Sequence, residues 1–144
     1  MARAHMASQR SRPPRQAAVL AVRQDGADVE VCLIRRKSSG AWGIPKGFID
    51  PGYTREETAL NEAWEEAGIR GRLIGDAVGT YEYAKFGASL TVAVYVMRVV
   101  EELPAWPEMR SRERRWASFN EAASALKGHP VRPFLDHVRA RLHS

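Results

Sequence analysis

The 144-residue chain has only one cysteine, Cys32, which excludes an internal disulfide and a cysteine-based zinc site. No apolar run approaches the ~18–20 residues that a membrane helix needs. The first fifteen residues lack the apolar core of a secretory signal, so we expect a cytoplasmic location by default. A hydrophobic content of 44% and a charged content of 27% are ordinary for one soluble globular domain.

Acidic residues are absent from residues 1–15, which carry four arginines and a Pro13-Pro14 pair. We expect a flexible basic tail here, and its Ala-His-Met-Ala-Ser run resembles a cloning scar. Of the 22 basic residues, 18 remain outside this tail, against 17 acidic ones, so the tail accounts for most of the net charge of +5. A nearly neutral folded part without an RNA-binding motif disfavours nucleic acid as a partner.

Apolar runs and alternating apolar residues predict strands at 17–22, 29–36, 73–77, 79–83, 90–100 and 115–119. Helices are predicted at 54–67, 120–126 and 131–142, and the glycines and prolines of 42–52 predict an irregular loop. Strands thus precede and follow one central helix. This order favours a three-layer α/β/α sandwich or an α+β domain over a doubly wound parallel sheet.

The helix predicted at 54–67 begins with a capping box formed by Thr54 and Glu57, and Gly68 ends it. At 100° per residue its apolar side chains form one stripe, expected to face the core: Leu60, Ala63, Trp64 and Ala67. Three carboxylates gather on the opposite side: Glu62, Glu65 and Glu66. They indicate either a solvated acidic face or the oxygen ligands of a hard divalent cation, completed by carbonyls of the preceding loop.

The segment 47–69, GFIDPGYTREETALNEAWEEAGI, resembles the signature of the Nudix hydrolase superfamily. The matching positions are Gly47, Glu62, Glu65, Glu66, Gly68 and Ile69, with Ala63 in an aliphatic slot. Two positions depart from the signature: Tyr53 replaces its first glutamate and Asn61 replaces its arginine. Because both charges are lost together, no unpaired buried charge is left, and a Tyr–Asn hydrogen bond is one replacement for the lost ion pair.

The resemblance implies a single-domain Nudix-like α/β/α sandwich with a mixed sheet over residues 16–144. It implies a Mg²⁺- or Mn²⁺-dependent pyrophosphohydrolase in which Glu62, Glu65 and Glu66 are catalytic and, with the Gly47 carbonyl, bind the metal. A further carboxylate often joins from the loop before the last strand, and Glu108 and Glu113 are the candidates. Which glutamate is the general base stays open, and a non-catalytic nucleotide-binding module on the same fold is an alternative.

The charge distribution favours a small polyphosphate substrate. The substrate-binding candidates are the four cations of residues 35–46, a stretch without acids: Arg35, Arg36, Lys37 and Lys46. Residues 47–66 carry a net −5 and residues 107–144 a net +4, so an acidic centre lies between basic segments. The segment 42–47, WGIPKG, resembles hydrolases of dinucleoside polyphosphates and diphosphoinositol polyphosphates. We expect a dinucleoside polyphosphate substrate, with diphosphoinositol polyphosphates or nucleoside triphosphates as alternatives.

Overall fold

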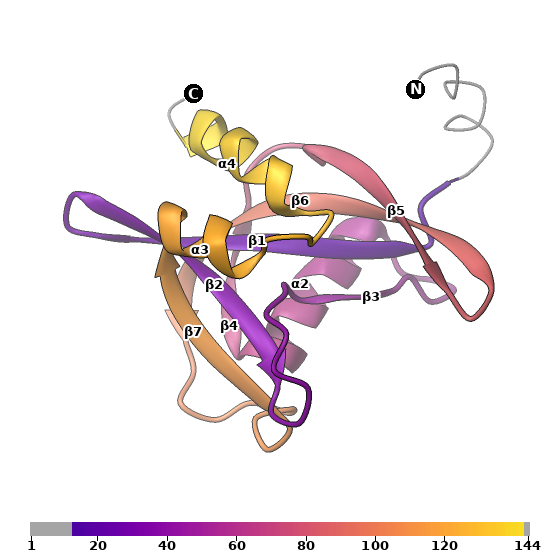
Figure 1. Ribbon diagram of the computed structural model, residues 1–144, viewed down its shortest axis with the longest axis horizontal. Coiled ribbons are helices and arrows are strands. Elements are labelled where there is room, and N and C mark those ends of the chain that lie inside the picture. The colour runs from indigo at the N-terminus through magenta and orange to yellow at the C-terminus, as the bar shows by residue number, and fades with distance from the viewer. Residues whose placement is uncertain (1–12, 143–144) are drawn as a thin grey trace.

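The computed structural model describes residues 13–142 (Figure 1). The strands are β1 (Gln16–Asp25), β2 (Asp28–Arg36), β3 (Lys46–Phe48), β4 (Ile69–Leu73), β5 (Gly79–Lys85), β6 (Ala88–Glu102) and β7 (Arg112–Ser118). The helices are α2 (Arg55–Ala67), α3 (Phe119–Ala125) and α4 (Leu135–Leu142), with the 3₁₀ turn η2 (Arg132–Phe134) before α4.

All seven strands belong to one mixed sheet with the order β4-β6-β1-β2-β7, while β3 pairs with β1 and β5 with β6. Only the β1–β6 pair is parallel among these strands. The edge of β1 changes partner along its length, from β3 at residues 16–18 to β2 at residues 22–25. The sheet therefore opens between β2 and β3, and the candidate site lies beside this opening.

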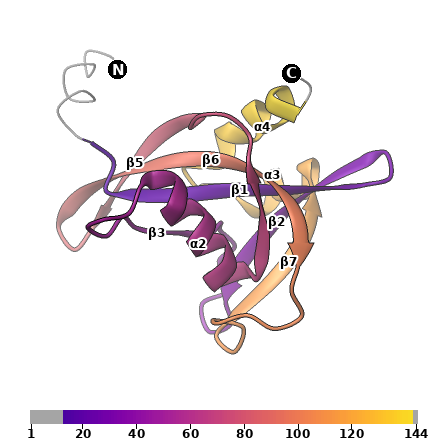
Figure 2. The same ribbon diagram turned by 180° about the vertical axis from the view of Figure 1, so that it is seen from behind.

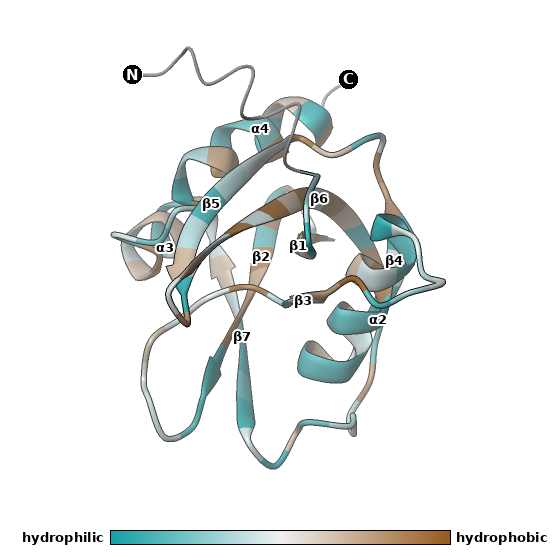
Figure 3. Cartoon of the chain, turned by 90° about the vertical axis from the view of Figure 1, so that its right-hand side faces the viewer, coloured by the Kyte–Doolittle hydropathy of each residue, from teal (hydrophilic) through white to brown (hydrophobic). Residues whose placement is uncertain are grey.

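Helices cover both faces of the sheet, which confirms the predicted α/β/α sandwich. Helices α3 and α4 lie in front of the sheet in Figure 1, and α2 lies in front in the reverse view of Figure 2. Alternate residues of β1 supply two cores, with Leu20 facing α3 and α4 and Val19 facing α2. Figure 3 shows hydrophobic β6 between the two layers and a largely hydrophilic outer surface on α2.

Two strand predictions and one loop prediction need correction. The strand predicted at 73–77 is wrong, because β4 begins at Ile69 and ends at Leu73. Its sequence, IRGRL, does alternate, but Gly71 and two arginines hide the pattern; Gly71 is needed because a Cβ there would overlap the Arg98 carbonyl. The predicted irregular loop contains the short strand β3, and β7 begins three residues before the strand predicted at 115–119.

Helix α2 begins and ends as predicted, but its buried face is rotated. The Thr54–Glu57 capping box forms, and Gly68 ends the helix with a left-handed backbone at φ 66°. The buried residues are Thr58, Ala59, Ala63, Glu66 and Ala67. Leu60 is 36% exposed and Trp64 is half-buried beneath the Arg70 guanidinium, so placing both in the core was wrong. Small side chains let the helix lie close to the sheet, and the larger ones are displaced to its flanks.

The predicted tail falls mainly on residues 1–12, outside the described residues. Within the described part, the chain is already held at Arg15, whose amide donates to the Thr91 carbonyl and whose carbonyl accepts from the Ile49 amide at 2.9 Å. No helix in residues 13–142 is both long and apolar enough to cross a membrane.

Candidate metal and active site

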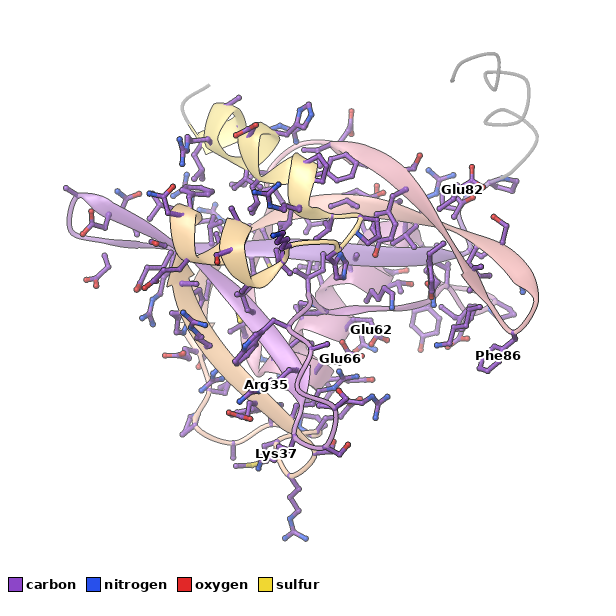
Figure 4. The ribbon with its side chains drawn as sticks, in the orientation of Figure 1. Arg35, Lys37, Glu62, Glu66, Glu82 and Phe86 are labelled. Carbon is purple, nitrogen blue, oxygen red and sulfur yellow. The ribbon has the colours of Figure 1, made fainter. Side chains whose placement is uncertain are left out.

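The carboxylate of Glu62 lies directly against the backbone of β3. A Cβ added at Gly47 would overlap this carboxylate, so the close approach of α2 to β3 requires glycine at this position. Figure 4 shows Glu62 and Glu66 next to one another beside the opening of the sheet. The structure thus brings together three of the predicted site residues, Gly47, Glu62 and Glu66.

Glu66 is the buried member of the pair, with only 7% of its surface exposed. Its Oε1 accepts from the Lys46 amide at 3.2 Å and its Oε2 accepts from Arg112 Nη2 at 3.0 Å. Burial raises the pKa of Glu66, although Arg112 and the Lys46 amide oppose the rise. Burial and the neighbouring carboxylates of Glu66 and Glu65 raise the pKa of Glu62 to about 8.

Glu65 faces the same hollow as Glu62 but has a different partner. A pocket of about 200 Å³ is lined by Phe48, Asp50, Tyr53, Thr58, Asn61, Glu62 and Glu65. Asn61 Nδ2 donates to Glu65 Oε1 at 3.0 Å, so Asn61 bonds along its own helix and not to Tyr53, which is 59% exposed. A wider pocket of about 740 Å³ lies beside the β1–β2 turn and α3, and it is lined by none of the predicted site residues.

The two candidates for an additional carboxylate face different surroundings. The Glu108 amide donates to the Glu65 carbonyl at 3.0 Å, and the Glu108 carboxylate binds Arg112 Nε at 3.0 Å. Its negative charge also contributes to the raised pKa values of Glu62 and Glu66, so Glu108 belongs to the acidic cluster. Glu113 follows Arg112 directly on β7, so strand alternation turns its side chain to the sheet face opposite that of Arg112. There it pairs with Arg35 at 2.9 Å.

The four predicted substrate-binding cations also separate. Burial lowers the pKa of Lys46, and the positive charge of nearby Arg36 lowers it further. Arg35 stacks on the Trp42 ring at 4.5 Å and is tied to Glu113, away from the acidic cluster. Lys37 is exposed beyond the end of β2 (Figure 4). The structure therefore brings two of the four cations to the acidic cluster.

The segment 103–111 covers the end of α2, and the sequence predicted a role there only for Glu108. Arg114 Nη1 donates to the carbonyls of Ala67 and Leu103, at 2.8 and 3.0 Å, and thus caps α2. Trp106 Nε1 donates to the Glu66 carbonyl at 3.1 Å. A strand predicted to begin at Arg112 would have revealed this role. Its period-two alternation places residues 112 and 114 on the same face as Trp116, which is the α2 face.

A second group of side chains surrounds Lys46 on the sheet face opposite α2. Lys46 Nζ lies 5.0 Å from the centre of the Tyr83 ring, and Tyr81 lies between Tyr83 and His129 with ring separations of 6.2 and 6.1 Å. His129 Nδ1 accepts from the Val131 amide, which places the proton of the neutral ring on Nε2. Burial and nearby Lys46 lower the pKa of His129. The buried Tyr81 hydroxyl has no hydrogen-bond partner within residues 13–142.

The donor chemistry of the acidic cluster fits a hard divalent cation. Within residues 13–142, no three carboxylate, imidazole or thiol groups are close enough together to hold a metal ion as they stand. Glu62 nevertheless lies half-buried beside Glu66, and burial together with repulsion from Glu66 and Glu65 raises its pKa to about 8. Carboxylate and carbonyl oxygens are the preferred ligands of Mg²⁺, and its charge would relieve this repulsion.

The chain belongs to the NUDIX family, whose domain matches residues 13–138. Nudix hydrolase 16, mitochondrial, of Arabidopsis thaliana is 35% identical over 115 residues, covering 74% of this chain and 63% of that protein. The chain thus spans less than two thirds of this relative's length. The mouse diphosphoinositol polyphosphate phosphohydrolase 3-alpha is 29% identical over 117 residues, covering 80% of this chain and 70% of that protein.

Solved structures share the fold. A Caenorhabditis elegans Ap4A hydrolase in a binary complex superposes with a TM-score of 0.75, covering 91% of this chain and 98% of that chain at 21% identity. A Nudix hydrolase from M. smegmatis, RenU, has a TM-score of 0.69 at 26% identity, covering 88% of this chain and 86% of that chain. The described fold is therefore the one expected for the family.

Proposed function

We propose that this protein is a divalent-metal-dependent pyrophosphohydrolase that cleaves a phosphoanhydride bond in a dinucleoside polyphosphate. The observation that carries the proposal is the Glu62–Glu66 pair packed against Gly47, with Lys46, Arg36 and Arg112 around it. Membership of a family whose relatives are named hydrolases supports the enzymatic reading over a non-catalytic binding module.

Each group has a role in this proposal. Glu62, Glu65 and Glu66 hold the metal with the Gly47 carbonyl, and Glu108 is the additional carboxylate. When bound, a divalent cation polarises the phosphoryl oxygens and lowers the pKa of the attacking water. Lys46 and Arg36 neutralise the phosphate chain, and burial of Glu66 excludes water from the inner side of the site.

The proposed preference for a nucleoside rests on the far side of Lys46. Tyr83 and Tyr81 form an aromatic wall there, and His129 presents an N–H donor. A phosphate chain bound by Lys46 draws that ammonium from the Tyr83 ring, which leaves the ring free to stack on a base. An inositol ring carrying many phosphates would require several cations around it, whereas this side of the site offers mainly aromatic rings beside Lys46.

A panel of substrates tests this proposal. Purified protein is incubated with Mg²⁺ or Mn²⁺ and with diadenosine polyphosphates, diphosphoinositol polyphosphates or nucleoside triphosphates. EDTA-treated protein and Glu66→Gln protein control for contaminating hydrolases. We expect metal-dependent turnover to be fastest with the diadenosine compounds, and absence of turnover with every substrate refutes an enzymatic function.

Two variants separate the substrate classes. Replacement of Tyr83 by Leu removes the aromatic ring and should lower kcat/KM for diadenosine polyphosphates by about tenfold, the value of one stacking contact. Phe86→Leu is the matched control, because Phe86 is 90% exposed at the β5–β6 turn. An equal loss with diphosphoinositol polyphosphates would contradict a base-stacking role for Tyr83.

Diphosphoinositol polyphosphate hydrolysis is the second candidate. The mouse relative with that name favours it, as does the gathering of Arg36, Lys46 and Arg112 at the acidic cluster. Faster turnover of diphosphoinositol polyphosphates in the panel would select it.

A cytoplasmic location is also part of the proposal. Expression of the fluorescently tagged chain in its native cells tests it.

A further inference from the structure

The most enclosed ion pair within residues 13–142 joins Arg112 to Glu66. The two side chains are only 14% and 10% exposed, whereas the pairs of Arg23 and Arg35 leave about a third of each arginine exposed. The same guanidinium also binds Glu108 through Nε at 3.0 Å. Arg112 thus connects the strand β7, the segment 103–111 and the helix α2.

Main-chain hydrogen bonds hold Arg112 in this position. Its amide donates to the Glu108 carbonyl at 3.0 Å, and the Glu108 amide donates to the Glu65 carbonyl at 3.0 Å. In the β2–β7 register Arg112 lies opposite Arg36, on the face of the sheet that α2 covers. The guanidinium is therefore fixed before any substrate or metal arrives.

Glu66 is consequently held at both of its oxygens. Oε1 accepts from the Lys46 amide and Oε2 from Arg112, and each oxygen keeps a further lone pair. Asn61 on α2 does not take the place of Arg112 as a partner of Glu66, because it carries no charge and donates to Glu65 instead. Arg112 places a positive charge beside this buried carboxylate and, through the bond to Oε2, fixes its direction.

We propose that Arg112 is a positioning residue for Glu66. It fixes the direction of the Glu66 carboxylate toward the metal and, through Glu108, anchors the segment 103–111 on α2. The inference rests on the proposed function only for the kinetic part of its test, since it concerns how this chain orders Glu66 in the metal-free protein. Partners of this kind around a metal ligand alter metal affinity or activity by about 10- to 100-fold.

The test compares Arg112→Gln and Arg112→Lys with Arg110→Gln. Arg110 is exposed, lies two residues away and forms no ion pair within residues 13–142, so its replacement removes the same charge without breaking such a contact. In metal-free protein, we expect Arg112→Gln to lower the Tm by about 10 °C. Mn²⁺ binding, followed by electron paramagnetic resonance without substrate, should weaken by about tenfold.

The kinetic measurement is made on variants shown to be folded by circular dichroism. Arg112→Gln should lower kcat by about a hundredfold with little change in KM, because a displaced carboxylate impairs the reaction more than substrate binding. Arg112→Lys, which retains the charge, should recover part of kcat and of the Mn²⁺ affinity. Arg110→Gln should leave all three quantities unchanged.

Two results overturn the proposal. One is a raised KM with unchanged kcat and Mn²⁺ affinity in Arg112→Gln, which makes Arg112 a substrate contact. The other is a set of values equal to those of Arg110→Gln. Should the wild-type protein hydrolyse none of the tested substrates, the proposed function fails alone, because the Tm and Mn²⁺ measurements still decide the role of Arg112.

Discussion

Replacing Glu62 by Gln should make the metal-free protein more stable at alkaline pH. The Glu62 carboxylate lies against Gly47 beside the buried Glu66, and its pKa is raised from 4.5 to about 8. The folded protein therefore binds this proton more tightly than the unfolded chain. The stability that Glu62 contributes is fully present below pH 4.5 and is lost as the pH rises through about 8.

The size of the effect follows from this pKa. The rise corresponds to at most about 5 kcal/mol, because one pKa unit equals about 1.4 kcal/mol. Glu62 is only half-buried, so solvent screening reduces the expected value to about 1–2 kcal/mol. For a chain of this length, the Tm of Glu62→Gln at pH 9 should exceed that of the wild type by about 3–8 °C.

Scanning calorimetry at pH 5, 7 and 9 in EDTA measures the effect. The matched control is Glu101→Gln, which neutralises an exposed glutamate on β6. Addition of Mg²⁺ at pH 9 should give the wild type the higher Tm of the two proteins. The cation stabilises the two carboxylates of the wild type more than the one carboxylate and one amide of Glu62→Gln. The reasoning is refuted by a Glu62→Gln protein whose Tm follows the same pH dependence as the wild type.

The remaining predictions concern the same cluster. Glu66→Gln should lower the hydrolysis rate by a few hundredfold (about 3–4 kcal/mol) while circular dichroism shows a folded protein; an unchanged rate removes Glu66 from the mechanism. Gly47→Ala should reduce kcat by at least about tenfold, because its Cβ displaces the Glu62 carboxylate, and steady-state kinetics against wild-type protein would detect it. Glu108→Gln should weaken Mn²⁺ binding by several-fold whereas Glu113→Gln should not, and equal titration curves for the two variants would contradict the assignment of Glu108.

The loss of two signature charges has different consequences at positions 53 and 61. Tyr53 is exposed at the mouth of the small pocket, and Asn61 extends along α2 to Glu65. Neither residue replaces a charge near Glu66. That charge comes from β7, 46 residues farther along the chain, through Arg112. The missing charges are thus visible in the signature segment itself, whereas the compensating charge lies on a distant strand.

The sequence alone determined the features that depend on local spacing. The capping box of Thr54 and Glu57, the end of α2 at Gly68 and the glutamates of its acidic side follow from helix geometry over a few residues. The two-sided burial of β1 follows from its unbroken apolar run. The likeness to the family signature supplied the mixed sheet and the expected role of Gly47, which composition does not contain.

Only the tertiary structure decided which charges meet. Arg35 and Arg36 are adjacent in sequence, yet strand alternation turns Arg35 to Trp42 and Glu113 and Arg36 to the face that α2 covers. The same alternation separates Glu113 from Arg112. The direction of each side chain depends on the register between β2 and β7, and register is set by pairing between distant segments. The residues of α2 could be identified as a site from the sequence, but their partners from β3 and β7 could not.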